Sequence, residues 1–155
     1  MRKTPAMWLR HICVFTMGLG IAVLLWSSPT MSAPRGLMSI CKAVSSNRFQ
    51  CNFPGFPGPE KSLMIQYVSM SCSNTGGTSS LQLFQVLATP PNTNTEINYP
   101  IPISSQSNVA GVVSAGSPVT LYSKLPPSAL IDLYPAPAPG AACSVSMSGD
   151  EYASY

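Results

Sequence analysis

Histidine and tryptophan are scarce in this chain, and both are confined to its N-terminal part. The sole histidine is His11, and the two tryptophans are Trp8 and Trp26. Beyond Trp26 no imidazole remains to act as the base of a serine or cysteine triad. Histidine-based metal sites are excluded from that part of the chain for the same reason. We therefore expect a protein that is not an enzyme, with no catalytic residues and no cofactor.

Charged residues are also few, at 8% of the sequence. Three of the 8 basic residues, Arg2, Lys3 and Arg10, account for the formal net charge of +3. The remaining basic residues and the 5 acidic residues balance one another: Arg35, Lys42, Arg48, Lys61, Lys124, Glu60, Glu96, Asp132, Asp150 and Glu151. A neutral domain lacks the positive patch that releases counterions from a nucleic-acid backbone, so we exclude nucleic acid as a partner.

One long apolar run is present, from Ile12 to Trp26. Basic residues precede this run and the small or polar residues 27–30 follow it, which is the form of a secretory signal. We expect a helical signal peptide over residues 1–33, with cleavage near Ser32 or Ala33. An uncleaved anchor is the alternative, although the run is shorter than the roughly 20 apolar residues of a spanning helix. Export predicts a periplasmic or extracellular protein that leaves the membrane after cleavage.

Five cysteines occur, of which Cys13 lies inside the apolar run. The other four, Cys41, Cys51, Cys72 and Cys143, predict two disulfides in an oxidising compartment. Four cysteines allow three pairings. We favour Cys41 with Cys51, which are close in sequence, and Cys72 with Cys143, which lie on strand-like segments. These spacings are unlike the close cysteine pairs of structural zinc sites, so no metal is expected.

Alternating apolar and polar residues predict β-strands throughout the exported part. The clearest strand is Cys143–Ser148, where Cys143, Val145 and Met147 alternate with serines. Residues 119–124 and 129–134 alternate in the same way and are joined by a plausible turn. Between Glu96 and Ile103, prolines 100 and 102 indicate an edge strand or extended coil.

Two segments, Leu63–Cys72 and Leu81–Ala88, are apolar at both odd and even positions. We expect them to be central strands covered on both sides and joined as a hairpin by Ser73–Ser80. Residues 53–59 and 135–140 are rich in proline and predict stiff connectors. Six or seven short strands then indicate a two-sheet antiparallel β-sandwich, jelly-roll-like, over residues 61–155. Residues 34–60 are expected to form a separate N-terminal loop region.

The features from Lys61 to Tyr152 resemble those of uncharacterised small exported bacterial β-sandwich proteins with one core disulfide. The matching residues are Val68, Ser69 and Cys72, then Val119, Leu121 and Tyr122, and then the final segment Cys143–Gly149. The resemblance covers about three-fifths of the chain. It implies the sandwich and the pairing of Cys72 with Cys143 through the core, but that group has no known activity to transfer.

Three functions remain open, and we favour a binding or surface-interaction module for an unknown protein or glycan. Aromatic faces and hydroxyls suffice for such binding, and the candidate residues are Phe53, Phe56, Tyr122 and Tyr134, although ordinary packing against the sheet is the favoured explanation for them. A structural subunit of a pilus or coat is less favoured, because Pro34–Ile40 is too short and lacks the alternation of a donor strand.

The third possibility is a hydrolase that needs only two carboxylates. All five acidic residues are candidates, but we expect each to be a solvated surface charge. Asp132 falls on the polar side of its strand, and Asp150 and Glu151 follow the last predicted strand.

Overall fold

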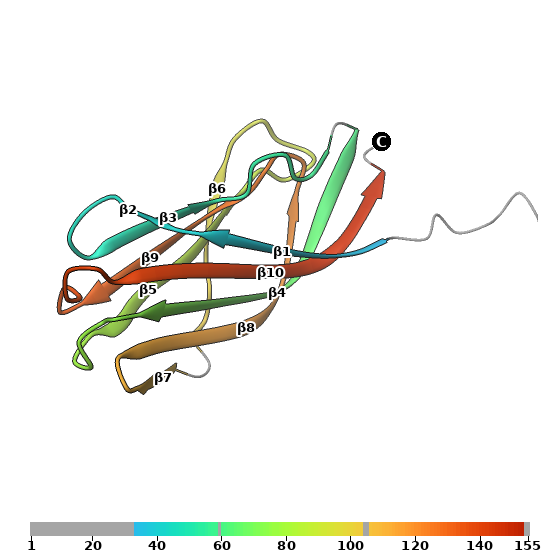
Figure 1. Ribbon diagram of the computed structural model, residues 1–155. Coiled ribbons are helices and arrows are strands. Elements are labelled where there is room, and N and C mark those ends of the chain that lie inside the picture. The colour runs from blue at the N-terminus through green and yellow to red at the C-terminus, as the bar shows by residue number, and fades with distance from the viewer. Residues whose placement is uncertain (1–32, 59, 104–105, 154–155) are drawn as a thin grey trace, which may run out of the picture. The chain divides into compact units, whose positions relative to one another are not determined.

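The computed structural model describes residues 33–58, 60–103 and 106–153, which form two five-stranded antiparallel sheets packed together (Figure 1). The strands are β1 (Ala33–Ile40), β2 (Lys42–Ala43), β3 (Arg48–Asn52), β4 (Lys61–Ser73), β5 (Ser80–Ala88), β6 (Ile97–Pro100), β7 (Gln106–Val109), β8 (Val112–Ser123), β9 (Ser128–Tyr134) and β10 (Ala142–Ala153). Sheet A has the order β1-β10-β4-β8-β7, and sheet B has the order β2-β3-β9-β5-β6. The predicted all-β sandwich is confirmed.

The predicted signal peptide falls almost wholly on residues 1–32, which lie outside the described residues. Among the described residues, no helix is long and apolar enough to cross a membrane.

The core lies between the sheets and is filled by alternate residues of nearly every strand. In β10, Cys143, Val145 and Met147 are buried while the intervening serines face outward, as the alternation predicted. The same holds for β9, where Ile131 and Leu133 are fully buried. Each such side chain contributes about 1.5–3 kcal/mol when it is fully removed from water. One apolar face per strand therefore decides which side of each sheet meets the other.

β4 and β5 have apolar residues at both odd and even positions, but the reason is not that both of their sides are covered. Both strands contain a β-bulge, at Gln66 in β4 against β10 and at Gln82 in β5 against β9, where the pairing skips one residue. A bulge reverses the inward parity, so Leu63 and Ile65 are followed by buried Val68 rather than by buried Tyr67. Tyr67 is exposed, so β4 is covered on one side only, and the expectation of two covered sides is wrong.

The segment Ser73–Ser80 is a crossover between sheets and not a hairpin, because β4 belongs to sheet A and β5 to sheet B. It is fastened to the turn after β7, since the Thr75 hydroxyl donates to the Gly111 carbonyl at 2.9 Å and the Asn108 amide donates to the Ser79 carbonyl at 2.7 Å. Sequence alone does not separate the two arrangements, since both read as strand, turn, strand.

The sandwich begins at β1, so residues 34–60 are not a separate region. β1 pairs with β10 at the edge of sheet A, and β3 pairs with β9 inside sheet B. Ten strands therefore replace the six or seven that we expected. The prolines near Ile97 do mark an edge strand, because β6 is the last strand of sheet B.

Both disulfides pair as favoured: Cys41 with Cys51, and Cys72 with Cys143. Cys72 and Cys143 lie directly opposite each other on neighbouring strands of sheet A, so this bond is buried within one sheet and does not cross the core. It closes the longer loop, with a sequence separation of 71, and by chain entropy contributes about 4 kcal/mol. The Cys41–Cys51 bond holds the point where the chain passes from sheet A to sheet B.

Candidate functional site

The four aromatic candidates do not form one surface. Phe53 and Phe56 are buried, with 4% and 9% exposure, because the connector between β3 and β4 folds these rings onto the core. They are thus removed from the accessible surface, and packing is their role. Tyr122 and Tyr134 are exposed, but they lie on sheet A and sheet B respectively. Tyr122 also packs edge to face against Tyr152, with ring centroids 6.2 Å apart.

Glu151 is not a solvated surface charge, contrary to our expectation, and it lies within β10 and not after it. It occupies the inward parity of the strand and is 7% exposed. Lys61 Nζ and Arg35 Nε each lie 2.9 Å from its carboxylate oxygens. The hydrogen bond from Lys61 lowers the pKa of Glu151 below its ordinary value of 4.5, against the opposing effect of burial. Glu151 therefore stays ionised, whereas a general acid requires a raised pKa.

Asp132 lies on the outer face of sheet B, as its parity predicted. It accepts two hydrogen bonds from the directly opposite Arg48, at 2.7 Å and 2.6 Å. The hydrogen bond to Asp132 in turn raises the pKa of Arg48. Glu60 and Glu96 are exposed. Asp132 is thus paired with Arg48, and Glu60 and Glu96 are exposed to solvent.

The outer face of sheet A carries an ordered group of serines, which we call the serine face. Its residues are the outward members of β4, β8 and β10: Ser69, Ser71, Ser114, Ser144, Ser146 and Ser148. The pairing aligns them in rows across the strands. Ser144 lies opposite Ser71, which lies opposite Ser114, and in the next row Ser146 lies opposite Ser69.

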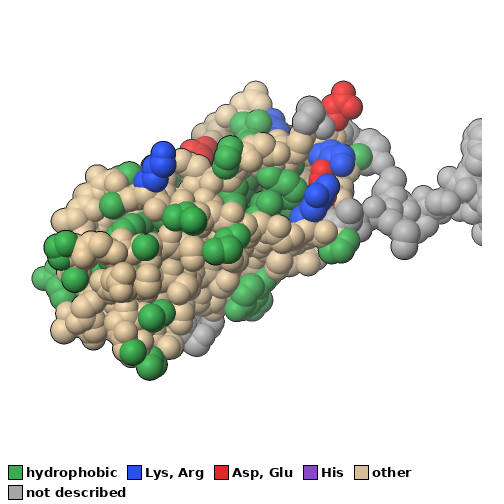
Figure 2. All heavy atoms as spheres, in the orientation of Figure 1, with side chains coloured by type: hydrophobic (Ala, Val, Ile, Leu, Met, Phe, Trp, Pro, Cys, Tyr) green, Lys and Arg blue, Asp and Glu red, His purple; other side chains and the backbone are tan. Residues whose placement is uncertain are grey.

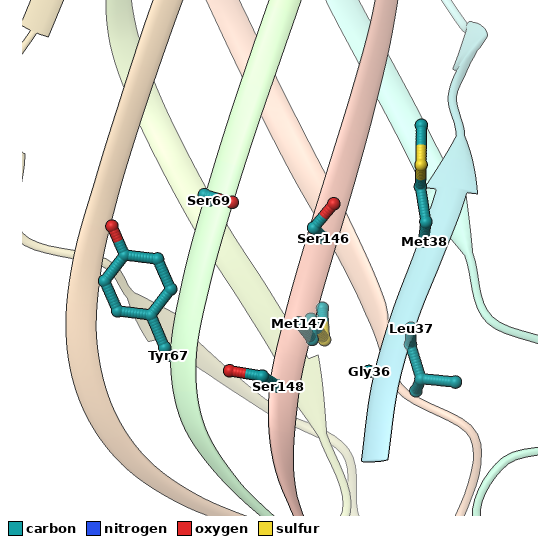
Figure 3. Close-up of a pocket in the computed structure, with 8 residues that line it drawn as sticks. All are labelled: Gly36, Leu37, Met38, Tyr67, Ser69, Ser146, Met147 and Ser148. Carbon is teal, nitrogen blue, oxygen red and sulfur yellow. The ribbon is translucent and has the colours of Figure 1, made fainter.

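A shallow trough of about 330 Å³ crosses the serine face at β1, β10 and β4. Figure 3 shows Tyr67 on one side and Met38 on the other, with Ser69, Ser146 and Ser148 between them. Gly36, opposite Ser148, leaves space beside Met38 because no side chain fills its position. Among the described residues, none hydrogen-bonds the hydroxyls of Ser69, Ser146 and Ser148. The trough therefore offers three free hydroxyls between two apolar walls.

The position of Tyr67 follows from the strand beside it. Its ring lies over Gly116 of β8, where an added Cβ would overlap the Tyr67 hydroxyl and lie 3.1 Å from Cζ. Any larger residue at position 116 would lift the ring away from the sheet. The absence of a side chain at Gly116 thus allows the Tyr67 ring to lie against β8, where it forms one side of the trough.

Charge is kept away from the trough. None of its eight lining residues is charged. Figure 2 shows the charged side chains gathered in a few places, with most of the visible face formed by uncharged atoms. On the same face, Asp150 accepts a hydrogen bond from Gln66 at 3.0 Å. The surface is thus suited to a neutral ligand.

A second hollow of about 280 Å³ lies between the β2–β3 turn and the proline-rich loop. Its lining is mostly alanine, proline and glycine, with two serines. It offers fewer groups for specific recognition than the trough does.

Sequence reasoning missed the serine face because outward serines are what any solvated strand contains. One signal was present: serines recur at every second position in two segments, 69–73 and 144–148. That these segments are neighbours in one sheet follows only from the pairing of β4 with β10.

Within the described residues, no group of three or more His, Cys, Asp or Glu side chains could hold a metal ion. A scan against protein-family models finds no match to this chain, and a search of curated proteins finds none either.

Proposed function

We propose that this protein is an exported, non-catalytic β-sandwich that binds a strand of neutral glycan across the serine face. One observation carries the proposal: three unengaged serine hydroxyls, those of Ser69, Ser146 and Ser148, lie between Tyr67 and Met38 in an uncharged trough.

The chemistry of the trough suits a sugar. A serine hydroxyl both donates and accepts hydrogen bonds, so it matches a sugar hydroxyl in either direction. The ring of Tyr67, which is 45% exposed, offers an apolar surface to the C–H face of a pyranose. The absence of charge in the lining favours a neutral glycan over an acidic one, which would require basic partners.

The expected affinity of one trough is low. A neutral hydrogen bond contributes about 0.5–1.5 kcal/mol net. Three such bonds and one partly covered aromatic ring total at most about 6 kcal/mol. Once the entropy cost of association is subtracted, the Kd of one trough is on the order of millimolar or weaker. Weak single sites of this kind become useful on a repetitive polymer, where several are engaged together.

Export remains part of the proposal and is supported by two features. The two disulfides are compatible with an oxidising compartment, and residues 1–33 carry the pattern of a secretory signal. The resemblance to small exported bacterial sandwiches points in the same direction.

The proposal is tested with an array of neutral hexose and N-acetylhexosamine oligosaccharides, followed by calorimetry on any that bind. Tyr67→Ala should weaken binding at least fivefold. Tyr134→Ala is the matched control, because Tyr134 is also exposed but lies on sheet B, and it should leave the affinity unchanged. Absence of binding across the array, or equal effects of the two substitutions, would overturn the proposal.

A structural subunit is the alternative, and the open edge at β1 is the observation that bears on it. The carboxylate hydrolase is less supported, because Glu151 and Asp132 are both held by cations.

A further inference from the structure

The four edges of the two sheets differ in length. β2, β6 and β7 are edge strands of 2, 4 and 4 residues, whereas β1 is an edge strand of 8 residues. Natural sheets protect their edges by shortness, charge or bulges, because a long flat edge pairs readily with another strand. β1 has a regular register with β10 along its whole length. β8 also extends beyond Ala115, where β7 ends, but that stretch contains Pro118 and a register shift against β4. β1 is therefore the longest regular edge among the described strands.

The hydrogen-bond pattern shows which groups of β1 face outward. The Cys41 amide donates to the Cys143 carbonyl at 2.9 Å, so the odd-numbered residues of β1 point their backbone groups toward β10. The even-numbered residues, Gly36, Met38 and Ile40, therefore direct their N–H and C=O groups to the open edge. Met38 and Ile40 are also 71% and 78% exposed. Backbone donors, backbone acceptors and apolar side chains are thus presented together.

We infer that β1 pairs antiparallel with β1 of a second copy of this chain, joining two A sheets into one. The full overlap of residues 34–40 of both copies fixes the register. It places Gly36 opposite Met38 of the second copy, and Pro34 opposite Ile40. An atom added at Gly36 would meet nothing within 4 Å, so the Met38 side chain of the second copy has room there.

Charge supports the second copy as occupant. Arg35, the one charged residue of β1, is neutralised by Glu151 of its own chain. In the overlapping register each Arg35 faces Ser39 of the other copy, so the two guanidinium groups lie at opposite ends of the joint.

The joined sheet would carry the two troughs side by side on one face. The row Tyr67, Ser148, Gly36 of one copy continues into Met38, Ser146, Ser69 of the other. The pairing itself rests on the edge geometry and not on glycan binding, so either proposal can fail alone. If both hold, the dimer is a bivalent binder whose avidity for a polymer exceeds that of one trough by at least tenfold.

The test is sedimentation equilibrium of the exported chain, without glycan, from about 1 to 200 µM. We expect a monomer–dimer equilibrium in this range. Met38→Lys, which places a charge on the edge, should raise the dimer Kd at least tenfold. Val109→Lys is the matched control, because Val109 is 68% exposed on the short edge strand β7, and it should change the Kd less than twofold.

Amide hydrogen exchange provides a second measurement that needs no variant. On raising the concentration, the amides of Gly36, Met38 and Ile40 should become protected, while those of Leu37 and Ser39 are already bonded to β10. A monomer at every concentration, or a dimer that Val109→Lys disrupts and Met38→Lys does not, would overturn the inference. Protection in a mixture with another protein but not at high concentration alone would also overturn it.

Discussion

At the level of single residues, Glu151 shows that the position of a residue in a strand can decide its burial even when the side chain is charged. Its odd number in β10 places it on the inward parity with Val145 and Met147, but an acidic residue near a chain end reads as a surface charge. Arg35 and Lys61 resolve the conflict by binding it from the strands on either side. Partners so distant in sequence could not be identified from the sequence, because they meet only through the order β1-β10-β4.

The first prediction concerns pH. Because the folded-state pKa of Glu151 is lowered below 4.5, the carboxylate stabilises the fold fully above about pH 4.5. This stabilisation is lost as the pH falls through the lower folded-state pKa. The melting temperature of the protein should therefore fall more steeply below pH 4.5 than that of Glu151→Gln, in thermal unfolding followed by circular dichroism. Parallel pH profiles for the two proteins would show that the ion cluster contributes nothing.

The second prediction concerns Gly149, which passes very close to β4. An added Cβ there would overlap the Met64 carbonyl oxygen and lie 2.9 Å from the Ile65 Cα, both of them backbone atoms that cannot move aside freely. Gly149→Ala should lower the free energy of unfolding by about 3 kcal/mol in urea titration. The control is Gly36→Ala, with nothing within 4 Å, which should change it by no more than about 0.5 kcal/mol. Equal effects would contradict the close approach.

Among the strands, those with a regular alternation could be predicted from the sequence, and those with a β-bulge could not. Regular strands such as β9 and β10 were predictable, because a strict period of two needs no knowledge of the partner strand. β4 and β5 were not predictable, because each contains an extra residue that has no partner in the neighbouring strand. Gln66, for example, is recognised as extra only when β4 is aligned with β10. The same limit applies to β1, whose residues acquire strand structure only beside β10. Pairing between distant segments is the information that a local pattern lacks.

The third prediction is that Gln66 is an extra residue of β4 that the core does not require. Without it, Leu63, Ile65, Val68 and Met70 still fall on the inner face of sheet A, because they then alternate regularly with outward residues. The deletion variant should therefore still unfold cooperatively at 25 °C, and Gln66→Ala, which removes one exposed hydrogen bond to Asp150, should cost less than about 1 kcal/mol. Deletion of Ser69 is the contrasting variant, because it makes Val68 and Met70 adjacent and forces one of them outward, so it should abolish cooperative unfolding. Equal effects of the two deletions would contradict the assignment of Gln66 as the extra residue.

At the scale of the whole molecule, the outer face of sheet A joins three properties that the sequence showed only separately. Few charges, frequent serines and abundant strands were each visible, and together they indicated a neutral exported sandwich. The arrangement of the sheets adds the trough that we propose as the binding surface, since it sets β1, β10 and β4 side by side. Of the aromatic residues chosen from the sequence, Phe53 and Phe56 complete the core, whereas Tyr122 and Tyr134 are exposed on different sheets. Tyr67 could not be recognised from the sequence as an outward residue, because the bulge at Gln66 reverses the alternation of β4 just before it.

The most direct test of the central claim is a titration of the isotope-labelled protein with a neutral oligosaccharide that binds it on the array, followed by amide chemical shifts. Glycan binding at the trough predicts saturable shifts concentrated at Gly36, Tyr67, Ser69, Ser146 and Ser148, with those of sheet B unchanged. Shifts centred on the outer face of sheet B, around Tyr134, or on the hollow beside the proline-rich loop would contradict the assignment of the site.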